Sequence, residues 1–206
     1  MTTLVGGRAP VAWRRARTPA VPTGAGMSHA GRLLVATPLI ADPTFERTVV
    51  LVLAHGRDGA FGVVLNRPTD TTVGEVAPEW AGHAAAPGVV FLGGPVGQDS
   101  LLALGRSAAV GAHSENRIFA DCAAIDLERS PDDGPHWDGV RLFAGSAGWA
   151  PGQLDDELAE GAWWLADADP QDVTATDPEH QWSAVLRRQR GEVAWFANHP
   201  EDPSAN

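Results

Sequence analysis

Three short segments of this sequence combine polar side chains with glycine or proline, and such segments can form binding loops. The first is the Asn-Arg-Pro sequence at 66–68, which follows a run of apolar residues. Arg67 can bind an anion through its guanidinium, and Asn66 can bind a ligand or hold a backbone turn. The alternative is structural, because Asn66 can cap a turn while Arg67 pairs with an acid such as Asp42 or Glu157.

The second segment is rich in glycine and runs from 93 to 97. The consecutive backbone N–H groups of Gly93 and Gly94 could form a nest that binds an anion. The segment matches neither G-x-x-x-x-G-K-[ST] nor G-x-G-x-x-G, and the chain has no Lys to reach a terminal phosphate. The alternative is that these glycines allow positive φ angles or close packing of strands.

The third segment, Gly-Trp-Ala-Pro-Gly-Gln-Leu at 148–154, leads into an expected helix. The N–H groups at the start of that helix could hold an anion. Gln153 and Glu157 are four residues apart, about one helical turn, and could share a ligand. The alternative is that Trp149 fills the core while Gln153 satisfies the loop backbone.

Together, these segments predict a single hollow at the rim of a sheet, with the Arg67 guanidinium inside it. A small anionic ligand or a protein partner is the expected occupant. The residues expected to bind the ligand are Asn66, Arg67, Gly93, Gly94, Trp149, Gln153 and Glu157.

No catalytic or metal-binding set is evident in the sequence. Ser146 lies in Ala-Gly-Ser-Ala-Gly, which lacks the first glycine of a nucleophile elbow, and no His or Asp partner can be named by spacing. The His residues form neither HxH nor HExxH, so neither a metal site nor a cofactor is expected. An acidic loop contains Asp132, Asp133, His136 and Asp138, and we interpret it as solvated.

Composition and charge limit the possible partners. The 206 residues carry a net charge of −11; residues 1–31 contain four Arg and no acid, whereas the remainder carries 11 Arg against 26 acids. The acidic body makes nucleic acid an unexpected partner.

The apolar runs are too short to span a membrane. Cys122, the single cysteine, excludes an intrachain disulfide and is expected to be a small buried hydrophobe, which is compatible with a cytoplasmic protein.

The elements that position these segments can be read from hydrophobic patterning. Apolar runs at 32–40 and 48–54, an Asp-Gly turn at 58–59 and a return run at 60–65 predict antiparallel strands. Further strands are expected at 89–92, 100–104, 117–120, 125–127, 141–144 and 163–166, with a turn at 145–148. Helices are expected near 73–77, 151–161 and 178–190, the last with Trp182, Val185 and Leu186 facing inward. The expected organisation is a flexible arm at 1–28, one domain at 29–197 and a frayed tail at 198–206.

Four segments, in this order and spacing, resemble the YqgE/AlgH family of bacterial proteins. They are LIADPTFERTVV at 39–50, GVVLNRP at 62–68, FLGGPV at 91–96 and GWAPGQL at 148–154. The resemblance covers roughly residues 30–192. It implies an α+β fold of one domain, with a mainly antiparallel, partly barrel-like sheet flanked by helices.

The sequence favours a non-enzymatic protein that binds a ligand or a partner, because special turns are present without a nucleophile and its base. Two alternatives are a transcriptional regulator, a label often given to this family that the acidic charge disfavours, and an enzyme of unrecognised class. In the enzyme interpretation, Asn66, Arg67, Gln153 and Glu157 are the candidates, with Glu157 as a general base if burial raises its pKa. The chain is expected to be a monomer or a dimer, since exposed strand edges invite pairing.

Overall fold

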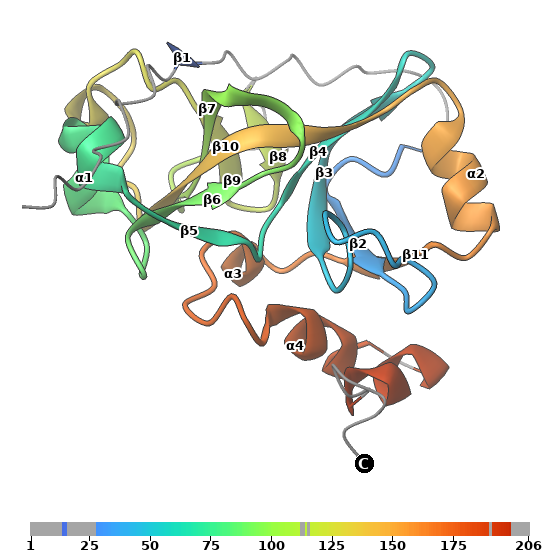
Figure 1. The fold of residues 1–206 in the computed structure, drawn as a ribbon. Helices are drawn as coiled ribbons and strands as arrows, with labels where there is room; N and C mark the ends of the chain where they lie inside the picture. Colours follow the sequence, from blue (N-terminus) through green and yellow to red (C-terminus); the bar gives the residue numbers. More distant parts are fainter. Residues whose placement is uncertain (1–13, 16–27, 112–113, 115, 190, 199–206) are drawn as a thin grey trace, which may run out of the picture.

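The structure, a computed structural model, describes residues 14–15, 28–111, 114, 116–189 and 191–198 (Figure 1). The strands are β1 (Arg14–Arg15), β2 (Arg32–Ala36), β3 (Val49–Gly56), β4 (Gly59–Val64), β5 (Pro68–Thr72), β6 (Val89–Leu92), β7 (Val96–Arg106), β8 (Arg117–Phe119), β9 (Cys122–Ile125), β10 (Gly139–Trp149) and β11 (Trp163–Asp167). The α-helices are α1 (Val73–Val76), α2 (Gln153–Ala159), α3 (Pro170–Val173) and α4 (Gln181–Arg187). The 3-10 helices are η1 (Pro78–His83), η2 (Pro131–Asp133) and η3 (Gly191–Asn198).

One half of the sheet is built on the predicted hairpin. β3 and β4 pair antiparallel, with Leu51 opposite Val63, and Gly59 adopts a φ of 115° at the turn. β2 and β11 extend this half in the order β11-β2-β3-β4. β3 is buried from Val49 to His55, as its nearly continuous apolar sequence predicts. The antiparallel arrangement predicted for this region is therefore confirmed.

β10 joins this half to the other half of the sheet. Residues 147–149 of β10 pair with β4, whereas residues 139–144 pair antiparallel with β7. The register shifts between Ala144 and Ser146, and Gly145 there has a φ of 70°. The predicted turn at 145–148 is therefore wrong, because these residues form a bulge inside one long strand that changes partners.

The other half contains β7, β9 and β8, with β6 against β10 and β5 against β6. The pairs β10–β6 and β1–β7 are parallel, and the other strand pairs are antiparallel. The sheet is curled into a half-barrel, with α1 beside one half, α2 beside the other, and α4 below (Figure 1). This arrangement confirms the predicted α+β fold with a mainly antiparallel, partly barrel-like sheet.

Helix α4 closes one side of the core. Trp182, Val185 and Leu186 are buried, as predicted, and the Trp182 indole Nε1 donates to the carbonyl of Ala36 at 2.9 Å. The helix begins at Gln181 rather than at 178, and the Asp177 side chain accepts from the His180 N–H at 3.3 Å. Among the described helices, none is long and apolar enough to cross a bilayer.

The chain ends are described only in part. Most of the N-terminal arm predicted at 1–28 lies outside the described residues, although β1 within it pairs with residues 100–101 of β7. Residues 199–206 of the predicted frayed tail also lie outside the described residues.

Candidate functional site

Asn66 lies just after β4, and its side-chain amide is bonded to backbone. Oδ1 accepts from the N–H of Val49 at 3.0 Å, and Nδ2 donates to the carbonyl of Arg47 at 2.9 Å. The side chain is buried. These contacts fasten the exit of β4 to the entry of β3, which matches the structural alternative. Ligand binding by Asn66 stays a prediction.

Arg67 is half-buried, and its Nη2 donates to the backbone carbonyl of Glu46. The contacts of its guanidinium thus differ from the expected pairing with Asp42 or Glu157. Burial lowers the pKa of Arg67, and the nearby Glu46 carboxylate opposes that shift. The guanidinium is thereby held against the loop that precedes β3.

The glycine pair at 93–94 packs against the bulge of β10. The N–H of Gly93 donates to the carbonyl of Ala144 at 2.8 Å, so strand pairing already uses it. A Cβ atom on Gly93 would lie 2.4 Å from the carbonyl oxygen of Gly145, and one on Gly94 would lie 2.3 Å from the carbonyl carbon of Ser146. Close approach of two backbones explains this glycine pair.

Glu157 is the centre of a hydrogen-bond network at the start of α2. Its Oε2 accepts from the indole Nε1 of Trp149 at 2.9 Å and of Trp163 at 2.8 Å, and its Oε1 accepts from Gln153 Nε2 at 2.9 Å. The two indole rings meet edge to face, 6.2 Å apart. Gln153 Oε1 accepts from the N–H of Ala150 at 3.0 Å. Gln153 and Glu157 are therefore paired with each other, and Trp149 is buried in the core.

Substitution of Glu157 by Ala is expected to destabilise the protein by roughly 2–4 kcal/mol, because two buried indole N–H groups lose their acceptor. Urea unfolding of the variant measures the change. Glu160→Ala, at the exposed end of the same helix, is the matched control and is expected to change stability by less than about 0.5 kcal/mol. Equal stability of the two variants would show that the network contributes nothing.

The three predicted segments do not meet in one hollow. The first two adjoin, because the N–H of Leu92 donates to the carbonyl of Arg67 at 2.7 Å. The third begins beside the second, because Gly94 packs against Ser146 and Ala147, but it continues to the opposite end of β4, where Trp149 is opposite Ala60. Six residues of extended chain separate Ala60 from Asn66, which is about 20 Å of backbone. The predicted single hollow is therefore wrong, although ligand binding at each segment stays a prediction.

The remaining sequence candidates are also placed by the fold. Ser146 is buried within the β10 bulge. Asp132 and Asp133 lie in η2, and both are exposed. Cys122 is buried, as predicted, and burial raises the pKa of its thiol to about 12.

The fold brings together a cluster that no motif in the sequence indicates, in which two imidazoles face one carboxylate. Nε2 of His29 lies 3.8 Å from Asp155 Oδ1, and Nε2 of His55 lies 3.6 Å from the same oxygen. The three groups are near enough to suggest a metal site. However, His55 Nδ1 accepts from the backbone N–H of His29 at 3.2 Å, which places the proton of neutral His55 on Nε2. A protonated Nε2 cannot coordinate a metal, so the cluster is better described as a contact between imidazoles and a carboxylate.

This cluster predicts a pH response. Burial and the facing His55 lower the pKa of His29 from 6.5, Arg32 adds to the shift, and Asp155 opposes it. A lowered folded-state pKa means that the associated stability is complete above pH 6.5 and is lost as the pH falls through the folded-state value. We expect an NMR titration of the His29 ring to have its midpoint below 6.5. A His29 midpoint at or above 6.5 would contradict the prediction.

A groove of about 620 Å³ lies where the end of β7 meets α3, α4 and the segment between them. Helix α3 begins at Pro170 because Asp169 and Asp172 form a capping box. Asp169 Oδ1 accepts from the N–H of Gln171 at 2.8 Å, and Asp172 Oδ2 accepts from the N–H of Asp169 at 2.7 Å. None of the seven residues predicted to bind a ligand lines this groove.

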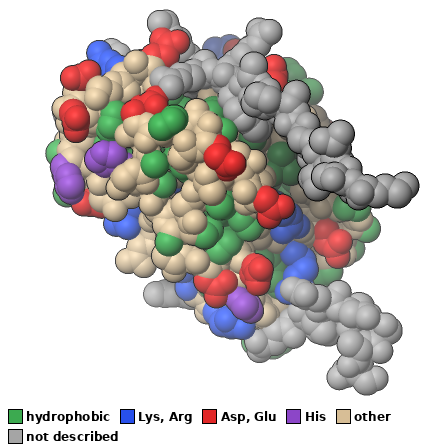
Figure 2. All heavy atoms as spheres, turned by 60° about the vertical axis from the view of Figure 1, so that its left-hand side comes forward, with side chains coloured by type: hydrophobic (Ala, Val, Ile, Leu, Met, Phe, Trp, Pro, Cys, Tyr) green, Lys and Arg blue, Asp and Glu red, His purple; other side chains and the backbone are tan. Residues whose placement is uncertain are grey.

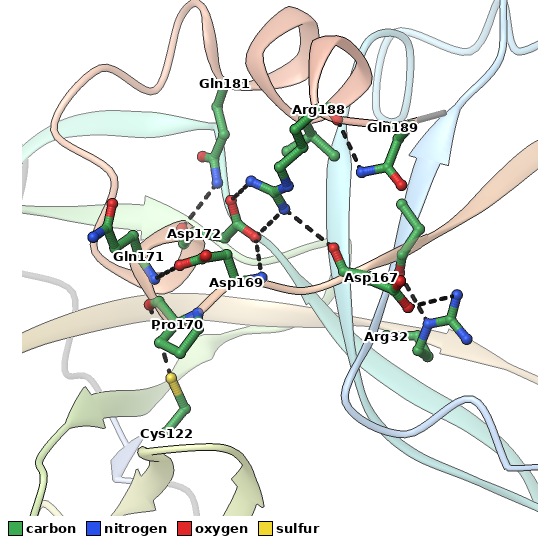
Figure 3. Close-up of polar contacts among 12 residues, drawn as sticks. Arg32, Cys122, Asp167, Asp169, Pro170, Gln171, Asp172, Gln181, Arg188 and Gln189 are labelled. Carbon is green, nitrogen blue, oxygen red and sulfur yellow. Dashed lines mark hydrogen bonds and ion pairs between the residues drawn. The ribbon is translucent and has the colours of Figure 1, made fainter. Parts of the chain in front are cut away.

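One wall of the groove is held by an ion pair between α3 and the end of α4. Arg188 makes a bidentate contact with the buried carboxylate of Asp172, in which Nη1 lies 2.6 Å from Oδ1 and Nη2 contacts Oδ2 (Figure 3). Nη2 also donates to the carbonyl of Asp167 at 3.2 Å. A charge-assisted fork of this kind fixes the geometry of both groups.

Two buried polar atoms among the groove residues have no hydrogen-bond partner in the described structure: Oε1 of Gln181 and Nε of Arg106. Gln181 is 3% exposed, and its Nε2 donates to the carbonyl of Asp172 at 2.8 Å. Its oxygen lies on the side turned away from that contact (Figure 3). Buried polar atoms without partners are rare in folded proteins, so two at one groove indicate a place where a ligand could supply the partners.

The absence of nucleic acid among the partners stays a prediction, and two features of the described residues bear on it. On the face seen in Figure 2, acidic and basic side chains are interspersed and form no continuous basic band. The helices α2 and α4 are separated by β11 and α3, so they do not form a helix-turn-helix unit.

The sequence is similar to a known protein family and to proteins from several bacteria. The sequence profile of the family described as AlgH-like matches residues 33–194. A UPF0301 protein of Streptomyces coelicolor is 50% identical over 185 residues, which cover 87% of this chain and 96% of the relative. A UPF0301 protein of Mycobacteroides abscessus is 40% identical over 183 residues, covering 86% of this chain and 88% of the relative.

Two solved structures have the same fold. A crystal structure of a protein from Corynebacterium diphtheriae matches with a TM-score of 0.76 and 34% identity, covering 90% of this chain and 95% of that chain. The solution structure of AlgH from Pseudomonas aeruginosa matches with a TM-score of 0.61 and 27% identity, covering 88% of this chain and 100% of that chain.

Proposed function

The chain belongs to the AlgH-like family, and from that premise we propose that it is a non-enzymatic binding protein whose groove between β7, α3 and α4 holds a small polar molecule. The observation that supports this proposal is the pair of partnerless buried atoms, an acceptor on Gln181 and a donor on Arg106. Each such atom costs about 1–3 kcal/mol when it is left unpaired. A ligand that pairs with both atoms recovers that free energy on binding.

The ligand must carry a hydrogen-bond donor for Gln181 Oε1 and an acceptor for Arg106 Nε. A carboxamide or a peptide group carries both functions within a few atoms.

The charges around the groove favour a neutral ligand over the anion expected from the sequence. Arg188 is already neutralised by Asp172, and Arg106 Nη2 lies 3.4 Å from Asp121 Oδ2. Asp169 and Asp177 add further negative charge to the lining. An anion would therefore meet arginines that are already paired with carboxylates, and the further negative charge of Asp169 and Asp177 would repel it.

Titration of the ¹⁵N-labelled full chain with N-acetylglycinamide, acetate and inorganic phosphate tests the proposal. We expect N-acetylglycinamide to cause saturable shifts of the Gln181 side-chain amide and the Arg106 Nε–H, and we expect no such shifts with the two anions. Gln181→Met keeps the side-chain length but removes the acceptor, and it should weaken binding about three- to tenfold, the effect of one hydrogen bond.

Gln189→Met is the matched control, because Gln189 follows α4 but does not line the groove. It should leave the affinity unchanged. Equal affinities of the two variants, or no saturable shift at the groove, would overturn the proposal. Stronger binding of acetate or phosphate would show instead that the groove selects anions.

A further inference from the structure

A second cavity, of about 570 Å³, lies on the other half of the sheet, between η1, β9 and the loop that follows β9. Its lining includes two indole rings, those of Trp80 and Trp137, and the apolar side chains of Val110 and Ile125. Both tryptophans are buried, with exposed fractions of 2% and 9%. The volume lies within the range of about 300–1,000 Å³ that is typical of small-molecule sites.

The indole Nε1 of Trp80 is buried and has no hydrogen-bond partner in the described structure. A buried Trp N–H usually finds an acceptor, because the desolvated donor is otherwise destabilising. Three other indoles of the core show the ordinary case: Trp149 and Trp163 donate to Glu157, and Trp182 donates to a backbone carbonyl. Trp80 therefore differs from these three tryptophans, and it is one of the residues that line the cavity.

We propose that this cavity binds a neutral, planar aromatic molecule with one hydrogen-bond acceptor, such as an aromatic ketone or amide, and that Trp80 Nε1 donates to that acceptor. The indoles of Trp80 and Trp137 provide aromatic surface for edge-to-face or offset contacts with a ring. Among the lining residues that the structure describes, the charged ones are Asp126 and Arg129, which are exposed and opposite in sign, so they favour neither an anion nor a cation. The site is independent of the groove formed by α3 and α4.

Two probes of nearly equal shape distinguish a hydrogen bond from Trp80 Nε1 from the mere occupation of the cavity by an apolar ring. Acetophenone has a ring and a carbonyl acceptor, whereas ethylbenzene has the ring without an acceptor. In the ¹⁵N-labelled full chain, we expect acetophenone to shift the Trp80 Nε1–H resonance downfield saturably and to bind about three- to tenfold more tightly than ethylbenzene. The side-chain amide of Gln181 should not move, which distinguishes this cavity from the groove.

Trp80→Phe keeps an aromatic ring and removes the donor, so it should abolish the preference for acetophenone. Trp164→Phe is the matched control, because Trp164 packs against Phe196 away from this cavity and should leave the preference intact. An unmoved Trp80 Nε1–H resonance in the unmodified protein overturns the proposal even if Trp80→Phe does not fold. Equal affinities for the two probes overturn it as well.

Discussion

Substitution of Gly94 by Ala is expected to remove more than about 4 kcal/mol of stability, or to prevent folding altogether. Gly94 has a φ of 148°, and a Cβ there would lie 2.3 Å from the carbonyl carbon and oxygen of Ser146 and 2.5 Å from the nitrogen of Ala147. These are backbone atoms of the β10 bulge, so rotation of a side chain cannot relieve the overlap. The bulge would have to shift where β10 exchanges β7 for β4. Urea unfolding, or the soluble yield if no folded protein is obtained, measures the effect.

Gly161→Ala is the control that measures the cost of a positive φ in a residue with a side chain, without the steric overlap that is present at Gly94. Gly161 has a φ of 78°, and a Cβ there would meet nothing within 4 Å. Its substitution should cost only about 1 kcal/mol, the strain of a left-handed conformation in a residue with a side chain. A Gly94→Ala variant as stable as Gly161→Ala would show that β6 and β10 do not need their close approach.

The parts of the fold that follow from local sequence were predicted. The Asp-Gly turn at 58–59 defined the β3–β4 hairpin, and apolar residues at helical spacing defined the buried face of α4. The β10 bulge was misread as a turn because Gly-Ser-Ala-Gly at 145–148 has the local composition of a turn. Pairing with strands distant in sequence keeps it extended. The short elements β5 and α3 were missed, although the Asp-Pro-Gln-Asp sequence at 169–172 carries a capping signal.

The candidate sites could be predicted from the sequence less well than the elements of the fold. The spacing of Gln153 and Glu157 correctly predicted that they lie on one helical face, but the two indoles that they serve come from β10 and β11. The groove joins Arg106 of β7 to Gln181 of α4, which are 75 positions apart in the sequence. Its defining feature is a missing hydrogen bond, and no pattern of residue types records such a feature.

Arg141 is a buried cation that links the groove to the sheet, and its replacement by Met is expected to destabilise the protein. The side chain is 1% exposed, Nη1 donates to the carbonyl of Ala175 at 2.9 Å, and Nη2 donates to the carbonyl of Ala86 at 2.6 Å. The guanidinium carbon lies 4.1 Å from the centre of the Phe91 ring. Burial lowers the pKa of Arg141 to about 10, so the group stays charged at neutral pH.

Arg141→Met keeps an unbranched apolar stem but leaves both carbonyls without their donor and removes the cation–π contact. Each unpaired carbonyl costs about 1–3 kcal/mol. Release from burying a charge offsets part of that cost, so we expect a net loss of roughly 2–4 kcal/mol in urea unfolding. Because Ala175 belongs to the groove, amide hydrogen exchange should accelerate at residues 174–176 more than in the β3–β4 hairpin. Arg187→Met, on the exposed face of α4, should change stability by less than about 0.5 kcal/mol. If the Arg141 variant is as stable as this control, and exchange at 174–176 is unchanged, the buried guanidinium does not anchor the wall of the groove.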